Sequence, residues 1–115
     1  MAAVESRVRE IRPQAIFNCA AYTNVDEAED AGRKANFDVN ALGVFYLATV
    51  AQKCGIDFVT VSTDYVFDGT REAGYDEDAV PNPINAYGLS KYLGETLARQ
   101  ACENAIVVRT SWLYG

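Results

Sequence analysis

The sequence contains no histidine, and its three cysteines are scattered without a Cys-x-x-Cys pair. The usual structural zinc sites need histidines or paired thiolates, so such a site is excluded. An odd number of isolated thiols is typical of a reducing compartment. We expect Cys19, Cys54 and Cys102 each to be a small buried residue. Without histidine, acid–base chemistry near neutral pH must come from another side chain.

Long apolar runs and basic clusters are also missing. No apolar stretch approaches the roughly 20 residues of a membrane span. The opening segment MAAVESRVRE carries charges where a signal peptide has its apolar centre. We therefore expect a soluble, cytoplasmic protein without a membrane partner. The ten Lys and Arg against sixteen Asp and Glu give a net charge of -6, which argues against nucleic acid as a partner.

The 115 residues are enough for one domain, which we expect to cover 1–115. The apolar spacing predicts helices over residues 2–12, 34–54 and 86–104, and strands over 15–21, 57–63 and 105–110. The strands do not alternate between apolar and polar residues, and helices separate them. This pattern is typical of a parallel sheet covered on both faces. The sequence thus predicts an α/β fold, a partial Rossmann-like doubly wound sheet of about three strands with flanking helices.

Ligands of such sheets bind at the carboxyl ends of the strands, which here are residues 20–23, 62–65 and 110–114. Tyr87 precedes Lys91 by four residues, so both lie on one face of a predicted helix. A neighbouring ammonium lowers the pKa of a phenol, which can then exchange a proton with an alcohol or ketone oxygen. The pair alone is also compatible with an ordinary exposed helix surface.

Further motifs give this pair a context. They are NCAAYTNVDEAE (18–29), VNALGVFYLA (39–48), VSTDYVFDG (61–69), PINAYGLSKYLGE (83–95) and VVRTSWLYG (107–115). With these motifs in this order, the sequence resembles the extended short-chain dehydrogenase/reductases from about residue 12 to its end. The resemblance implies that Tyr87 is the general acid and that Lys91 lowers its pKa and binds the nicotinamide ribose. It further implies that Thr63 holds the substrate oxygen and that Asn40 organises the site.

The same resemblance implies two sets of binding residues. The set implied for an NADPH or NADH cofactor is Ala20, Ala21, Tyr22, Ser62, Tyr87 and Lys91. The set implied for the substrate is Thr63, Asp64, Tyr87 and Trp112. Some members of the family use magnesium at their dimer contacts, but ligands for it are not identifiable in this sequence.

Within the family, the similarity is to reductases of nucleotide sugars. It implies reduction of the 4-keto group of dTDP-4-dehydro-6-deoxy-L-mannose to dTDP-L-rhamnose. Another nucleotide-sugar reductase or epimerase remains an alternative. A non-catalytic, reductase-like regulatory subunit or a bare interaction module is the alternative of a different class.

The sequence departs from the family in having no Gly-x-x-Gly-x-x-Gly loop, the segment that holds a cofactor pyrophosphate at a helix N-terminus. It also lacks the later segments that complete a sugar-nucleotide pocket. We therefore expect the central part of a reductase, inactive by itself. Uncovered edges of a small sheet favour association, so we expect a homo-oligomer or self-association.

Overall fold

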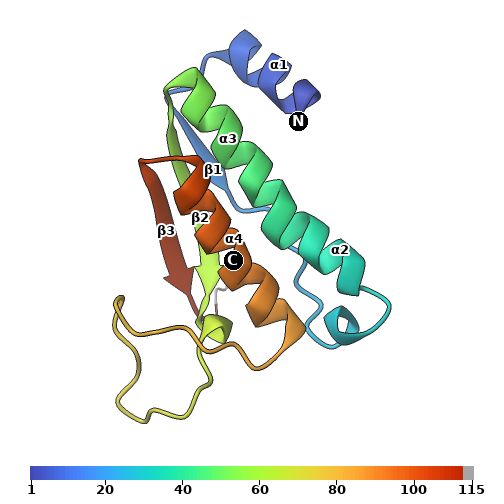
Figure 1. The fold of residues 1–115 in the computed structure, drawn as a ribbon, viewed down its shortest axis with the longest axis vertical. Helices are drawn as coiled ribbons and strands as arrows, with labels where there is room; N and C mark the ends of the chain where they lie inside the picture. Colours follow the sequence, from blue (N-terminus) through green and yellow to red (C-terminus); the bar gives the residue numbers. More distant parts are fainter. Residues whose placement is uncertain (113–115) are drawn as a thin grey trace.

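The computed structural model describes residues 1–112 and contains three parallel strands in one sheet (Figure 1). These strands are β1 (Ala15–Asn18), β2 (Asp57–Thr63) and β3 (Ala105–Thr110), in the spatial order β1-β2-β3. The register pairs Phe17 with Val59, and Val59 with Ile106. The predicted parallel α/β sheet is thus confirmed.

The helices follow the predicted ranges with some differences. They are α1 (Ala2–Ile11), η1 (Glu27–Glu29), α2 (Arg33–Phe37), η2 (Asp38–Gly43), α3 (Val44–Cys54), η3 (Asp64–Val66) and α4 (Ala86–Ala101). The segment η2 is a π-helix that joins α2 to α3, and η1 and η3 are single 3₁₀ turns. Gly55 ends α3 in a left-handed conformation with φ 65°, as its position predicted.

The strand predicted over 15–21 ends early, at Asn18. The Asn18 amide donates to the Thr60 hydroxyl at 3.1 Å, and its side-chain oxygen accepts from the backbone N–H of Ala20 at 3.3 Å. Asparagine side chains that bond their own backbone two residues on are typical of turns. Asn18 is therefore the last residue of the strand, and the chain then leaves the sheet and passes over the strand ends.

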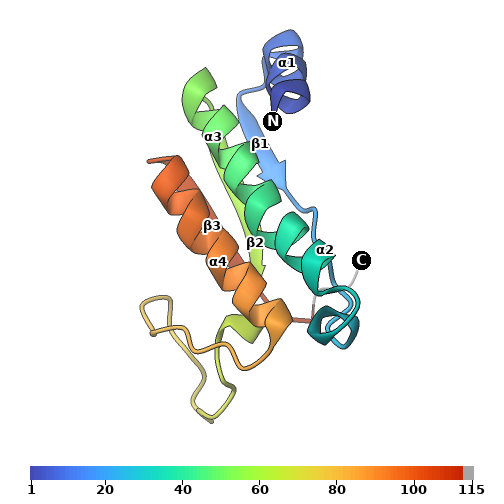
Figure 2. The same ribbon diagram turned by 45° about the vertical axis from the view of Figure 1, so that its right-hand side comes forward.

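One face of the sheet carries the core. Figures 1 and 2 show α3 and α4 side by side against this face. Phe58, which is fully buried, packs there among small side chains: Val44, Ala48, Ala51, Ala98 and Cys102. The alanines let both helices approach the sheet closely, and burying a phenylalanine stabilises the fold by about 1.5–3 kcal/mol.

The opposite face of the sheet is open in residues 1–112, so the prediction of cover on both faces is wrong for them. Phe17, Ile106 and Val108 are 72%, 55% and 45% exposed and lie on this open face. The reason is topological. Two successive right-handed crossovers that advance in the same direction along a sheet place both helices on the same side.

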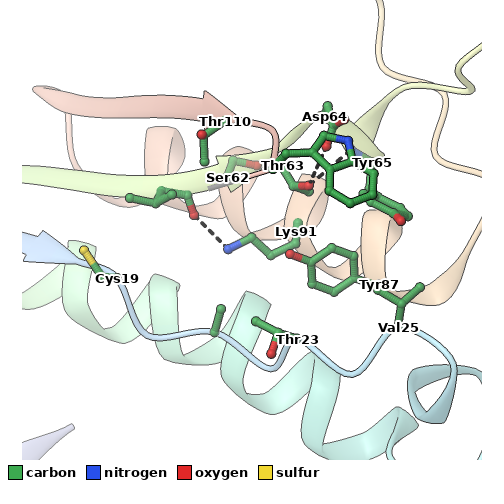
Figure 3. Close-up of a pocket in the computed structure, with 13 residues that line it drawn as sticks. Cys19, Thr23, Val25, Ser62, Thr63, Asp64, Tyr65, Tyr87, Lys91 and Thr110 are labelled. Atoms are coloured by element: carbon green, nitrogen blue, oxygen red, sulfur yellow. Dashed lines mark hydrogen bonds between the residues drawn. The ribbon is translucent and has the colours of Figure 1, made fainter. Parts of the chain in front are cut away.

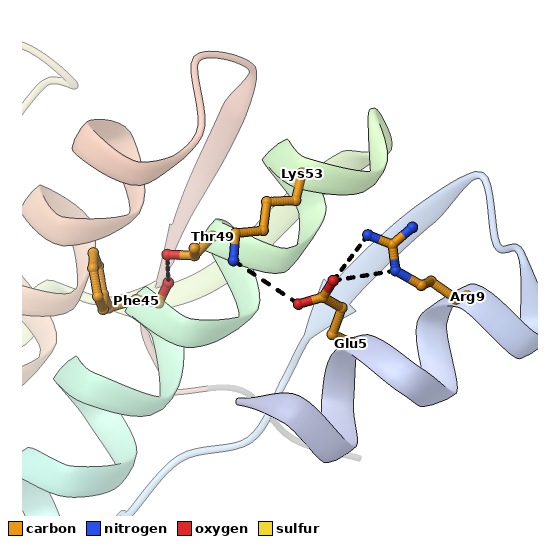
Figure 4. Close-up of polar contacts among 5 residues, drawn as sticks. All are labelled: Glu5, Arg9, Phe45, Thr49 and Lys53. Carbon is orange, nitrogen blue, oxygen red and sulfur yellow. Dashed lines mark hydrogen bonds and ion pairs between the residues drawn. The ribbon is translucent and has the colours of Figure 1, made fainter.

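Helix α1 lies beyond the amino end of the sheet and contacts α3 through charges (Figure 4). Glu5 accepts two hydrogen bonds from Arg9, and its other oxygen lies 3.9 Å from Lys53 Nζ. Exposed pairs of this kind contribute little to stability, because water and salt screen the charges. Helix α1 buries none of its residues, so little apolar burial attaches it to the rest of the fold.

The burial of the cysteines differs most from the prediction at Cys19. Cys102 is buried and Cys54 partly buried, but Cys19 is exposed because the chain has already left the sheet at that point. In the described part of the chain, no helix combines the length and apolar character needed to cross a bilayer.

Candidate active site

A pocket of about 420 Å³ lies at the carboxyl ends of the strands (Figure 3). Its walls come from the segment after β1, the end of β2, the first turns of α4, and the residues at and just after the end of β3. The residues that line it are Cys19, Ala21, Thr23, Val25, Val61, Ser62, Thr63, Asp64, Tyr65, Tyr87, Lys91, Thr110 and Trp112. Tyr87, Lys91 and Thr63, predicted to act together, therefore share one pocket.

The start of α4 places Tyr87 at the pocket. Asn85 has an extended backbone, and its side-chain oxygen accepts from the Gly88 N–H at 2.7 Å. This N-cap begins the helix at Ala86. Gly88 lets the first turn touch η3, since a Cβ there would lie 2.1 Å from the Tyr65 carbonyl oxygen. The Tyr87 ring consequently meets the Tyr65 ring edge to face, with centroids 5.5 Å apart.

The pKa of Tyr87 is raised from its ordinary value, first by burial and then by the nearby Asp64 and Tyr65. A hydrogen bond with the Thr63 side chain acts in the opposite direction. The net shift is thus upward, because the desolvation of the half-buried phenol dominates, and Lys91 is not among the groups that cause it; the predicted lowering by Lys91 stays a prediction. The hydroxyl of Tyr87 therefore keeps its proton at neutral pH, which suits a group that donates one.

Lys91 points from α4 to the end of β2. Its ammonium donates to the backbone carbonyl of Val61 at 2.7 Å, and the residue is only 5% exposed. Burial lowers the pKa of Lys91, and the charge of Glu95 opposes this shift. An ammonium has three N–H donors, so two are left to serve the pocket.

The end of β2 presents three polar side chains in sequence. Thr63 Oγ1 accepts from the Tyr65 N–H at 3.2 Å and donates to Asp64 at 3.1 Å, which fixes its hydroxyl at the pocket wall. The Ser62 hydroxyl is buried and has no hydrogen-bond partner among the described residues. Buried polar atoms are nearly always paired, so this hydroxyl has unused hydrogen-bonding capacity.

A buried amide network behind the pocket holds these parts together. Asn40, within the π-helix, bonds both the N–H and the carbonyl of Tyr22, at 2.9 and 3.0 Å. Its amide also reaches the side chain of Asn36, which in turn donates to the Ala86 carbonyl at 3.0 Å. Ser90 donates to the same Asn36 oxygen at 2.8 Å. The network ties the segment after β1 to the first turn of α4.

The sequence interpretation missed Asn36 and Ser90. Signals for them existed, since Asn36 lies four residues before Asn40 and Ser90 three residues after Tyr87. These spacings place each residue on the same helix face as its partner.

Most of the predicted binding residues line the pocket, but two do not. Ala21, Ser62, Asp64 and Trp112 are part of its wall. Ala20 is exposed outside it, and the Tyr22 hydroxyl turns away to donate to Glu27 at 2.7 Å. The wall also includes Cys19, Val25 and Val61, which lay outside the predicted strand ends.

The third predicted strand end is only partly described, since residues 113 and 114 lie outside the described residues. Within residues 1–112, no cluster of three or more acidic or cysteine side chains is arranged to hold a metal ion.

Comparison with known proteins matches the whole chain, residues 1–115, to the family model described as RmlD substrate binding domain. The chain is 49% identical over 105 residues to dTDP-4-keto-6-deoxy-D-glucose reductase of Streptomyces niveus, covering 90% of this chain and 36% of that protein. It is 43% identical over 111 residues to dTDP-4-dehydrorhamnose reductase of Sinorhizobium fredii, covering 96% and 37%. The chain thus spans little more than a third of these relatives.

Solved structures agree with this match. The crystal structure of dTDP-4-dehydrorhamnose reductase from Bacillus anthracis in complex with NADP superposes with a TM-score of 0.95 at 48% identity. The superposition covers 99% of this chain and 40% of that one. A UDP-Glc/GlcNAc 4-epimerase from Campylobacter jejuni has a TM-score of 0.82 at 22% identity, which shows a shared fold.

Proposed function

Because the chain belongs to the RmlD substrate binding domain family, we propose that the protein containing it is a nicotinamide-dependent reductase of a nucleotide sugar. The substrate proposed first is dTDP-4-dehydro-6-deoxy-L-mannose, whose 4-keto group would be reduced to give dTDP-L-rhamnose. Relatives named dTDP-4-dehydrorhamnose reductase, at 39–43% identity, support this choice.

One observation carries the proposal: a protonated tyrosine, a buried lysine and a threonine hydroxyl meet in a pocket at the carboxyl ends of parallel strands. Tyr87 supplies the acid that a chain without histidine otherwise lacks. Ligands of open α/β sheets bind at this place in the fold. The arrangement suits protonation of a carbonyl oxygen as that carbonyl is reduced.

The residues present fit the nicotinamide end of a cofactor. The unpaired hydroxyl of Ser62 and the free N–H donors of Lys91 offer hydrogen bonds to ribose hydroxyls. Ala21, which has a small side chain, lines the same pocket. A nicotinamide cofactor bound here would supply the hydride.

The side chains of this chain would handle the proton. Tyr87 would donate its hydroxyl proton to the C4 oxygen of the sugar. The Thr63 hydroxyl would hold that oxygen in place by turning its proton from Asp64 to the substrate. The Lys91 ammonium, one helical turn from Tyr87, would stabilise the phenolate that remains. Asp64 and Trp112 line the same pocket and would contact the sugar.

A second candidate substrate is dTDP-4-keto-6-deoxy-D-glucose. The relative named as the reductase of this compound is 49% identical to the chain. Both candidates carry a keto group at C4, so the proposed chemistry is the same. They differ in the sugar stereochemistry that the pocket must accept.

The test is an assay of the full-length protein that contains this chain. Each sugar is supplied with NADPH or NADH, cofactor oxidation is followed by absorbance, and the product is identified by NMR. Oxidation with formation of dTDP-L-rhamnose would support the first candidate, and oxidation only with the D-glucose derivative the second. Absence of turnover with both sugars would contradict the reductase proposal and favour a non-catalytic subunit.

A further inference from the structure

Glu95 is a buried carboxylate that the proposed chemistry does not use. It lies on α4 and is 1% exposed. Arg109 on β3 donates two hydrogen bonds to this carboxylate, from Nε to Oε1 at 3.0 Å and from Nη2 to Oε2 at 2.7 Å. The Arg109 guanidinium also lies over the Phe67 ring, 5.0 Å from its centroid. A buried ionised carboxylate is costly, so this pairing needs an explanation.

The position of Glu95 relative to Lys91 explains why a carboxylate is buried here. Glu95 follows Lys91 by four residues on α4, which places the two side chains on one face of the helix. Both line a narrow internal gap between α4 and β2, together with Thr60 and Ser62. From the pocket toward β3, the charged groups are therefore the Lys91 ammonium, the Glu95 carboxylate and the Arg109 guanidinium.

Other titratable groups also face Lys91. Tyr87 comes from the same helix, Asp64 and Tyr65 from η3, and Cys19 from the segment after β1, all lining the pocket with Lys91. Among the groups that shift the pKa of Lys91, Glu95 is the one that raises it against the effect of burial. Asp64 and Tyr65 instead act on the pKa of Tyr87.

We propose that Glu95 is a positioning residue that acts through Lys91: Arg109 holds its carboxylate on the helix face of Lys91, in the gap that both residues line, where it favours the charged form of the Lys91 side chain. The role of Lys91 in this statement rests on the proposed reductase function. Arg109 is needed because a buried carboxylate without a charged partner is costly. Arg109 lies on β3 and over the Phe67 ring, so the charges at the pocket depend on the position of β3 and of the loop that begins at Phe67.

The test is the titration of Lys91 in the full-length protein, followed by NMR with [¹³Cε]lysine. The Lys91 signal is assigned by its absence in Lys91→Arg. In Glu95→Gln, which keeps the shape but removes the charge, we expect Lys91 to titrate at least about 1 pH unit lower. The matched control is Glu103→Gln, an exposed carboxylate just beyond α4, which should leave the titration unchanged.

Glu95→Gln leaves Arg109 without its counter-charge, which can prevent folding. The double variant Glu95→Gln/Arg109→Met removes both charges, and such replacements of buried pairs are often tolerated. Lys91 should again titrate lower, by a smaller shift, because the opposing charge of Arg109 is removed together with that of Glu95. If Lys91 titrates as in the wild type in either variant, the proposal is wrong. The titration requires no turnover, so its failure is distinct from a failure of the reductase assay.

Discussion

The Lys91 ammonium donates to the Val61 carbonyl across the boundary between α4 and β2, at 2.7 Å. This bond places a cation at the strand end, beside the buried and unpaired hydroxyl of Ser62. The lysine is thus held at the strand end by the backbone of the sheet. Its two other N–H groups stay available for a ligand.

Lys91→Met should therefore weaken cofactor binding and slow reduction in the full-length protein. Hydrogen bonds to charged groups contribute about 1.5–3 kcal/mol, so losing one should cost about 10-fold or more. The measurements are the Kd for NADPH by fluorescence titration and the rate of cofactor oxidation. Lys34→Met, which removes an exposed lysine of α2, is the control and should change neither. Equal NADPH affinity in Lys91→Met would contradict the assignment.

The activity should fall at high pH and not near neutrality. Tyr87 must be protonated to donate, and burial raises its pKa above the ordinary value of about 10. The decline in kcat/KM should therefore begin only near or above that value. Asp64 contributes to the rise, so Asp64→Asn should move the decline to lower pH. A decline centred near pH 7 in the wild type would show that another group is the acid.

Gly94 is required for the contact between α4 and the π-helix. A Cβ there would lie 2.1 Å from the Asn40 carbonyl oxygen, which is backbone and cannot move aside alone. Gly94→Ala should destabilise the protein by about 1–3 kcal/mol, as overpacking typically does. Urea denaturation measures the change. Gly43→Ala, with its nearest atom at 3.4 Å, is the control and should be neutral or stabilising.

The 115-residue chain by itself should self-associate. The open sheet face exposes Phe17 and Ile106, and exposed apolar patches favour association. Light scattering should show a molar mass that rises with concentration. Phe17→Glu should reduce the rise, whereas Val80→Glu, on an exposed apolar residue of the loop, should not. A monomer at all concentrations would contradict this expectation.

Much of the fold could be predicted because its signals are local. Gly55 marked the end of α3, and the apolar run of β2 marked the central strand. The spacing of Tyr87 and Lys91, with Thr63 at a strand end, predicted a shared pocket, which the structure contains. These features depend on helix periodicity and on where parallel strands end.

The parts that sequence could not predict depend on packing between distant segments. The Glu95–Arg109 pair joins a helix to the next strand, and no local spacing indicates it. Burial of Tyr87 decides the direction of its pKa shift, and burial follows from the fold. The open sheet face follows from the order of the strands, which the one-dimensional pattern leaves undetermined.

In the proposed reaction, the Tyr87 hydroxyl gives its proton to the sugar oxygen. The most direct test of this step is the turnover of Tyr87→Phe in the full-length protein, with Tyr92→Phe as the control on the same helix outside the pocket. We expect a loss of about 10²- to 10⁴-fold in kcat with NADPH affinity nearly unchanged, and wild-type turnover in the control. Wild-type turnover in Tyr87→Phe would contradict this step.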